Sequence, residues 1–180
     1  MRTLVVVDVQ RDFYHPEGSL YVNGSEELPS AIAAVIGTYD AVIFTLDWHP
    51  VGHCSFKENG GIWPAHCVQF TEGAGLPGEI VPVQSVPTVC YHLKAFRTDY
   101  EQYGGFEQVS EQELQIFRDS DEVHFCGIAG DYCVKETIAN AMKYVPVSKI
   151  AVIPELVRSI DDGSTLEAFL TEHEIRRITL

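Results

Sequence analysis

The sequence is poor in positive charge and has no long apolar run. Lys and Arg total 12 against 26 Asp and Glu, a formal net charge of -14, and the pI is about 4.7. Phosphate backbones and anionic lipids bind basic surfaces, so nucleic acid and membranes are disfavoured as partners. The N-terminal MRTLVVVD has too short an apolar run for a signal sequence, and no stretch approaches a membrane span. We therefore expect a cytoplasmic protein.

Cysteines are few and widely spaced. The chain has five, an odd number, which is typical of reduced thiols rather than of a disulfide framework. We find neither internal repeats nor low-complexity tracts. A chain of 180 residues is long enough to bury an apolar core without disulfides, so we expect residues 1–180 to form a single domain.

Short apolar runs rich in Val and Ile recur along the chain and are typical of strands buried on both faces. These runs are residues 3–9, 41–46, 88–93, 123–128, 149–154 and 175–180. Helical patterns are residues 26–38, 110–118, 131–144 and 162–173. Asp161 or Asp162 is the expected N-cap of the last one. The alternation predicts the α/β class, a three-layer α/β/α fold with a mostly parallel central sheet of about six strands.

Polar residues stand where the predicted strands end. Asp8, Asp47 and Lys94 end the first three strands, and Cys133 follows the fourth after a short turn. Ligands of parallel sheets bind at the carboxyl ends of the strands, so we expect a site there. The irregular stretch from 48 to 87 leads away from this edge, and so long a connection is usually functional. The segment DVQRDF lacks the glycines of a dinucleotide-binding turn, which disfavours a dinucleotide fold.

Cys133 is the candidate nucleophile. It lies in the expected first turn of a helix, where the macrodipole would lower the thiol pKa. The alternative is a small core residue, which is the interpretation we favour for Cys90 and Cys126 inside apolar strands. A thiolate needs a base and a nearby cation, and Asp8, with a pKa raised by burial, and Lys94 offer them. Both could instead be structural, because spacing does not settle contacts between residues so remote in sequence.

The stretch DWHPVGHCSFKENGGIWPAHC (47–67) is rich in metal-ligating side chains. Two arrangements are open. Cys54 and Cys67 could join His49 and His66 around a structural zinc ion, or Asp-x-His and a distant His could form an open, working site.

Five segments stand in the order found in one enzyme family and cover nearly the whole chain. They are VVDVQRDF (6–13), FTLDWHPVGHCSF (44–56), WPAHCV (63–68), HLKAF (92–96) followed by DYEQYGGF (99–106), and GIAGDYCVKETIANA (127–141). Together they resemble the nicotinamidase/pyrazinamidase group of the isochorismatase-like cysteine hydrolases. The resemblance implies a catalytic triad of Asp8, Lys94 and Cys133. It also implies an oxyanion hole formed by the amides of Ala129 and Cys133, with a cis peptide before Ala129.

The resemblance further implies a metal site beside the triad. Asp47, His49 and His66 would bind one divalent ion, and mixed carboxylate and imidazole ligands suit zinc, with iron or manganese as alternatives. The fourth ligand is open between Glu58, His53 and water. His53 could instead hydrogen-bond a loop carbonyl.

The implied activity is hydrolysis of nicotinamide, and also of pyrazinamide, through a thioester on Cys133. Phe13 and Trp63 would flank the pyridine ring and Tyr103 would close the pocket, unless they are ordinary core aromatics. The role implied is recycling of nicotinamide into NAD synthesis. Two alternatives stay open, namely a related cysteine hydrolase acting on a different carboxamide and a non-catalytic zinc-binding module. A homo-oligomer is also open.

Overall fold

The computed structural model describes residues 1–80 and 85–179, and a parallel sheet forms its centre. In these residues the sheet has six strands in the order β3-β2-β1-β4-β5-β6, and every neighbouring pair is parallel. The strands are β1 Arg2–Val7, β2 Ala41–Asp47, β3 Thr88–Lys94, β4 Glu122–Ile128, β5 Ile150–Arg158 and β6 Arg176–Arg177. The predicted α/β class with a parallel sheet is confirmed.

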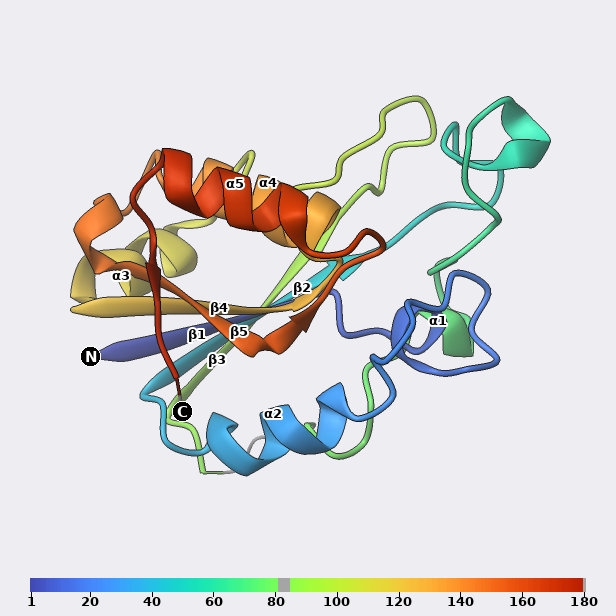
Figure 1. The fold of residues 1–180 in the computed structure, drawn as a ribbon. Helices are drawn as coiled ribbons and strands as arrows, with labels where there is room; N and C mark the ends of the chain where they lie inside the picture. Colours follow the sequence, from blue (N-terminus) through green and yellow to red (C-terminus); the bar gives the residue numbers. More distant parts are fainter. Residues whose placement is uncertain (81–84, 180) are drawn as a thin grey trace.

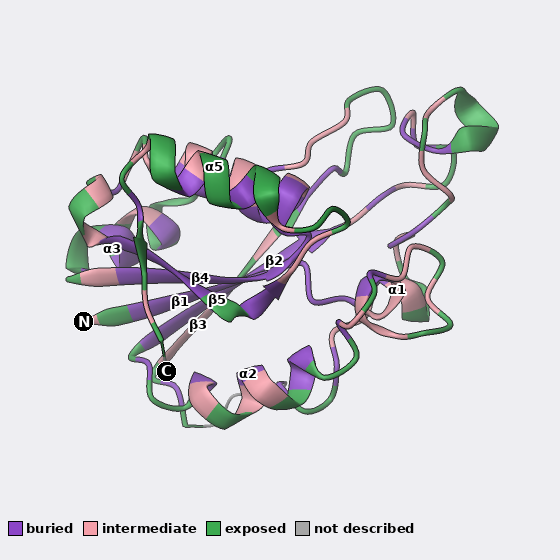
Figure 2. Ribbon diagram, in the orientation of Figure 1, coloured by how far each residue is buried: buried purple, intermediate pink, exposed green. Residues whose placement is uncertain are grey.

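Helices cover both faces of the sheet (Figure 1). Helix α2 lies on one face, and α3, α4 and α5 lie on the other. Their bounds are α2 Leu28–Ile36, α3 Glu111–Asp119, α4 Lys135–Ala141 and α5 Ser164–Glu172. Because strand side chains alternate between faces, the buried residues form one apolar cluster under each helical layer. The central strands β1, β2 and β4 are almost wholly buried between them (Figure 2). The three layers are therefore held by two separate cores.

Short helical turns connect these elements. They are α1 Arg11–Tyr14, η1 Lys57–Asn59, η2 Glu72–Ala74, the π-helical turn η3 Gly130–Val134, and η4 Val147–Lys149. Our prediction of one helix over 131–144 was too simple, because η3 precedes α4 there. No helix in the described part of the chain has the length and apolarity needed to cross a membrane.

Other boundaries also differ from the prediction. The first strand ends at Val7 rather than at residue 9, because Asp8 turns into the left-handed region with φ 49°. The predicted last strand shortens to Arg176–Arg177, and Leu180 lies outside the described residues. The N-cap of α5 is Gly163, with φ 87°, so neither predicted aspartate has that position.

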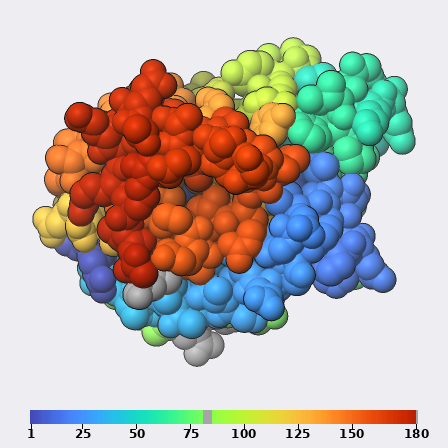
Figure 3. Space-filling view, in the orientation of Figure 1, coloured from blue at the N-terminus to red at the C-terminus, as the bar shows by residue number. Residues whose placement is uncertain are grey.

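The sheet brings the predicted polar residues to one edge. Asp8 follows β1, and Asp47 and Lys94 are paired as register partners at the ends of β2 and β3. The loops that leave this edge stand away from the sheet, and the segments near residues 55–65 and 97–105 lie against each other at one corner of the surface (Figure 3). The site is built between this edge and these loops.

Candidate active site

Asp8, Lys94 and Cys133 meet at the carboxyl edge of the sheet. Lys94 Nζ lies 2.9 Å from Asp8 Oδ2 and 3.7 Å from Cys133 Sγ. Asp8 and Lys94 are fully buried, and Cys133 is 6% exposed. The Thr45 hydroxyl donates a 2.6 Å hydrogen bond to Asp8 Oδ1, which fixes that carboxylate. Three residues remote in sequence thus form one buried cluster.

Burial controls the proton affinity of this cluster. Burial raises the pKa of Asp8, and the Lys94 ammonium opposes this only in part. Burial would lower the pKa of Lys94, but Asp47 and Asp8 together raise it well above its usual range. The pKa of the Cys133 thiol is raised by burial, which outweighs Lys94. The expectation of a lowered Cys133 pKa was wrong, because desolvation of the buried thiol exceeds the stabilisation by the Lys94 charge; the resting thiol therefore needs a base.

The turn before Cys133 is tightly packed. The Ile128-Ala129 peptide is cis, which confirms that expectation. Gly127 has φ 124° and lies so close to the Val7 backbone that a β-carbon would collide with the Val7 carbonyl oxygen. Ala129 and Cys133 both line the same pocket.

Asp47, His49 and His66 converge beside the cluster. Their donor atoms all lie within 4.8 Å of one another. His49 Nδ1 donates to the His66 carbonyl at 3.1 Å, and His66 Nδ1 donates to the Pro64 carbonyl at 2.8 Å. In each ring Nε2 is left to bind a ligand, and His49 Nε2 is buried with no hydrogen-bond partner. Imidazoles that ligate metals are typically anchored in this way through the other ring nitrogen.

The charges at this trio suit a divalent cation. Burial would raise the pKa of Asp47, but Lys94, His49 and His66 together lower it, so the carboxylate is ionised. Lys94 pairs with Asp47 Oδ1, and Oδ2 lies 3.9 Å from His66 Nε2. Burial lowers the pKa of His49 to about 4, which keeps its ring neutral. Two imidazoles and one carboxylate fit zinc, iron or manganese.

Neither His53 nor Glu58, the two residues considered as a fourth ligand, joins the donor group of Asp47, His49 and His66. His53 Nδ1 accepts from the Ser55 amide at 3.2 Å, and Nε2 donates to the Tyr100 carbonyl at 3.0 Å, so both nitrogens are engaged. Glu58 is exposed on η1 and joins no donor group in the described residues. Glu101, which the sequence did not single out, has a donor atom grouped with those of His49 and His53.

The two cysteines of this stretch do not join the histidines. Neither Cys54 nor Cys67 belongs to a donor group among the described residues. The Cys67 thiol is fully buried, its pKa is raised well above the usual value by burial, and its sulfur lies 3.8 Å from the Gly73 carbonyl oxygen. The arrangement therefore favours the open site over a structural zinc site.

Gln10 is a further residue that the sequence reasoning missed. Its carboxamide is fully buried and binds the Asp47 backbone at both polar groups, with Nε2 donating to the carbonyl and Oε1 accepting from the amide, both at 2.8 Å. Nε2 also donates to the Ala74 carbonyl at 3.0 Å. An amide side chain directly after an apolar strand was the available signal. Gln10 therefore bonds to both the amide and the carbonyl of Asp47, as the backbone of a neighbouring strand does in a sheet.

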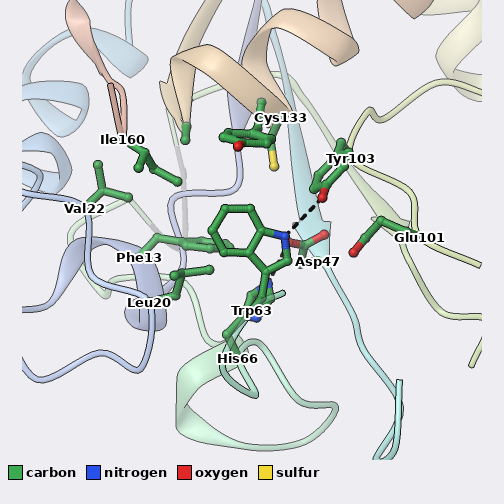
Figure 4. A pocket seen from close by; sticks show the side chains of 12 residues that line it. Phe13, Leu20, Val22, Asp47, Trp63, His66, Glu101, Tyr103, Cys133 and Ile160 are labelled. Carbon is green, nitrogen blue, oxygen red and sulfur yellow. Dashed lines mark hydrogen bonds and ion pairs between the residues drawn. The ribbon is translucent and has the colours of Figure 1, made fainter. Parts of the chain in front are cut away.

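An aromatic pocket lies beside the cluster and the trio, and Cys133, Asp47 and His66 are among the residues that line it (Figure 4). All three aromatics expected there line it, and Trp63 Nε1 donates to Tyr103 Oη at 3.1 Å. The Phe13 ring lies edge-on to His66, with centroids 5.4 Å apart. The sequence did not indicate the remaining apolar and aromatic wall, formed by Leu20, Val22, Tyr132 and Ile160. These aromatic and apolar walls are suited to a flat ring, and Cys133, Asp47 and His66 line the same pocket.

Comparison with known proteins gives a consistent result. The family described as the isochorismatase domain matches residues 2–144. A nicotinamidase/pyrazinamidase of Mycobacterium tuberculosis is 34% identical over 93% of this chain and 92% of its own. The structure of a Pyrococcus horikoshii pyrazinamidase in complex with zinc is 31% identical, covers 99% of each chain and superposes with a TM-score of 0.80. PnC1 from L. infantum, in complex with nicotinate, is 29% identical, covers 99% of this chain and 92% of its own, and has a TM-score of 0.84.

Proposed function

Since the chain belongs to the isochorismatase family, we propose that it is a nicotinamidase, an amidohydrolase that converts nicotinamide to nicotinate and ammonia and also accepts pyrazinamide. The proposal rests on one observation: Cys133 from the buried cluster with Asp8 and Lys94, and Asp47 and His66 from the trio with His49, line a single aromatic pocket. Relatives of about 30% identity over most of the chain bear the same activity in their names.

In the first half-reaction Cys133 is the nucleophile. Asp8 takes the thiol proton, and the sulfur attacks the carboxamide carbon while the Ala129 and Cys133 amides stabilise the developing oxyanion. Asp8 then gives the proton to the leaving nitrogen. The C–N bond breaks, ammonia departs, and a thioester on Cys133 remains. The raised pKa of Asp8 suits this role. A group that must first take up a proton and then return it works best when its pKa lies near the ambient pH.

In the second half-reaction water cleaves the thioester. Asp8 takes a proton from the water, the hydroxyl oxygen bonds to the acyl carbon, and the C–S bond breaks to release nicotinic acid, which loses its carboxyl proton to the solvent and becomes nicotinate. The proton returns to the sulfur and restores the thiol. Lys94 keeps its charge throughout, because two carboxylates hold its pKa high, and it stabilises each anionic form of its neighbours.

Asp47, His49 and His66 would hold the metal ion, and we propose zinc. A metal ion held there would supply a Lewis acid for a ring nitrogen, which would orient the ring and withdraw electrons from it. Support comes from the unpartnered His49 Nε2 and from the zinc complex of the Pyrococcus horikoshii relative. Phe13 and Trp63 would flank the ring and Tyr103 would close over it.

We propose that residues 1–180 act as one domain in the cytoplasm and return nicotinamide to NAD synthesis. The continuous sheet supports the proposal of a single domain.

The activity itself is tested by incubating the purified protein with nicotinamide, pyrazinamide and aliphatic amides, and by measuring ammonia release. We expect both ring amides to be cleaved and Cys133→Ala to be inactive. Cleavage of an aliphatic amide with nicotinamide untouched would show that the protein is a different hydrolase of this family.

A further inference from the structure

We propose that Asp12 is a positioning residue of the metal site, which holds in place the backbone of Cys67, the residue that follows His66 and is hydrogen-bonded to His49. The inference rests on the proposed metal centre and adds a residue that touches neither the ion nor the substrate. Asp12 lies in α1, one residue before the pocket residue Phe13. Its carboxylate bridges two loops, since Oδ2 accepts from the Cys67 amide at 2.7 Å and Oδ1 accepts from the Ser19 amide at 3.1 Å.

Cys67 is the residue through which Asp12 reaches the ligands. It directly follows His66, and its carbonyl accepts a 3.1 Å hydrogen bond from the His49 amide. One peptide segment is thus bonded to Asp12 on its amide side and to His49 on its carbonyl side. The His66 carbonyl in turn orients the His49 ring. A displacement of Cys67 would therefore move both imidazoles.

The backbone of Cys67 needs such a support. Its φ is 45°, in the left-handed region, which costs a non-glycine residue on the order of 1 kcal/mol. Strained conformations of this kind persist where the surroundings hold them. A hydrogen bond to a carboxylate is stronger than one to a neutral acceptor, so Asp12 is suited to hold the strained amide.

Gly73 provides the space for the carboxylate. A β-carbon at residue 73 would collide with the Asp12 carboxylate group itself. Because this carboxylate is anchored at both oxygens, a methyl group there would push it away from Cys67. Gly73→Ala is therefore a second, independent way to disturb the same contact.

The test compares zinc affinities by competition with a chromogenic chelator, in the absence of substrate. The variants are Asp12→Ala, Asp12→Asn, Gly73→Ala and the double variant Asp12→Ala/Gly73→Ala. Gly78→Ala is the control, because a β-carbon there meets nothing within 4 Å in the described part of the chain. We expect Asp12→Ala and Gly73→Ala to bind zinc about 10- to 100-fold more weakly, as is usual when a partner of a metal ligand is lost. Asp12→Asn retains one acceptor and should lose less.

Two further readouts separate positioning from other roles. The double variant should bind zinc no more weakly than Asp12→Ala, because Gly73→Ala has no carboxylate left to displace. Saturating zinc should restore the kcat of Asp12→Ala, since Asp12 touches no reacting atom. The proposal is overturned if Asp12→Ala binds zinc as tightly as wild type, if the two losses add, or if saturating zinc restores no activity. If Asp12→Ala does not fold, Asp12→Asn and Gly73→Ala decide by the same measure. A wild-type protein that takes up no zinc would instead refute the metal centre itself.

Discussion

Lys94 Nζ lies 2.9 Å from Asp8 Oδ2, and both side chains are fully buried. The same ammonium pairs with Asp47, so one cation is shared by two buried carboxyl groups. Asp8 belongs to the cluster with Cys133, and Asp47 belongs to the trio with His49 and His66. Lys94 is therefore the electrostatic link between the two halves of the site.

Replacing Lys94 should destabilise the fold as well as abolish activity. Lys94→Met would leave two carboxylates buried without their cation, and loss of one partner from a buried ion pair typically costs about 3 to 5 kcal/mol. We expect the free energy of unfolding, measured by urea titration of metal-free protein, to fall by that amount. The control is Lys143→Met, an exposed lysine bonded to Asn140. A loss below about 1 kcal/mol would show that the charges at this cluster are compensated in another way.

Two cysteine variants separate the hydrolase from a structural zinc module. Cys133→Ala should fold normally and lose essentially all amide hydrolysis, because it removes only the nucleophile. Cys54→Ala should keep both its fold and its activity, since Cys54 belongs to no donor group in the described structure. Circular dichroism and ammonia release measure the two properties. An unfolded Cys54→Ala beside an unaffected Cys133→Ala would support the structural zinc site.

Removal of the metal should abolish activity and preserve the fold. The trio lies at the sheet edge, whereas two apolar clusters hold the layers together. We therefore expect a chelator to stop hydrolysis and a divalent ion to restore it, while the far-ultraviolet circular dichroism spectrum stays unchanged. Unfolding on chelation would assign the ion a structural role.

The sequence predicted those parts of the site that lie on regular structure. Asp8, Asp47 and Lys94 are found at strand ends, and continuous apolar runs reveal where such strands stop. The residues that hold the site's loops in place could not be predicted from apolar runs. Asp12 bonds to a backbone amide 55 positions away, and nothing local to either residue records that contact.

The pKa of Cys133 is a second property that the local sequence did not predict. Its place near a helix start predicted a lowered pKa, and the structure raises it because the thiol is buried. Burial depends on the packing of several loops, and this is a property of the whole fold. The N-cap of α5 is similar, because Gly163 takes a left-handed conformation that the two aspartates before it do not reveal.

Ile160 should contribute to substrate binding. This residue lines the pocket although 48% of it is exposed. Its backbone amide donates a 2.9 Å hydrogen bond to Oδ1 of Asp131, which lies in η3 two residues before Cys133. Ile160→Ala would remove apolar contact with the ring, so we expect a KM increase of about threefold to tenfold with little change in kcat. Asp131→Ala should raise KM similarly. A fall in kcat with constant KM would mean that this loop acts on the chemical step.

Glu113 should make stability depend on pH in a defined window. Burial alone would raise the pKa of Glu113, but hydrogen bonds from His92 and Ser110 outweigh it and lower the pKa below its ordinary value of 4.5. A carboxyl group whose pKa is lowered on folding stabilises the protein above the unfolded-state pKa, and this contribution is lost as the pH falls through the folded-state pKa. Glu113 also closes a capping box with Ser110 at the start of α3.

We therefore expect Glu113→Gln to lower the free energy of unfolding by about 1 kcal/mol at pH 7, the usual contribution of a helix cap. The difference from wild type should stay constant down to about pH 4.5 and shrink below it, because the wild-type carboxylate then takes up a proton. Urea titrations at several pH values measure the difference. Glu111→Gln, an exposed neighbour on the same helix, is the matched control and should show no such change. A difference that grew as the pH fell would mean that Glu113 is protonated more readily in the folded protein than in the unfolded chain.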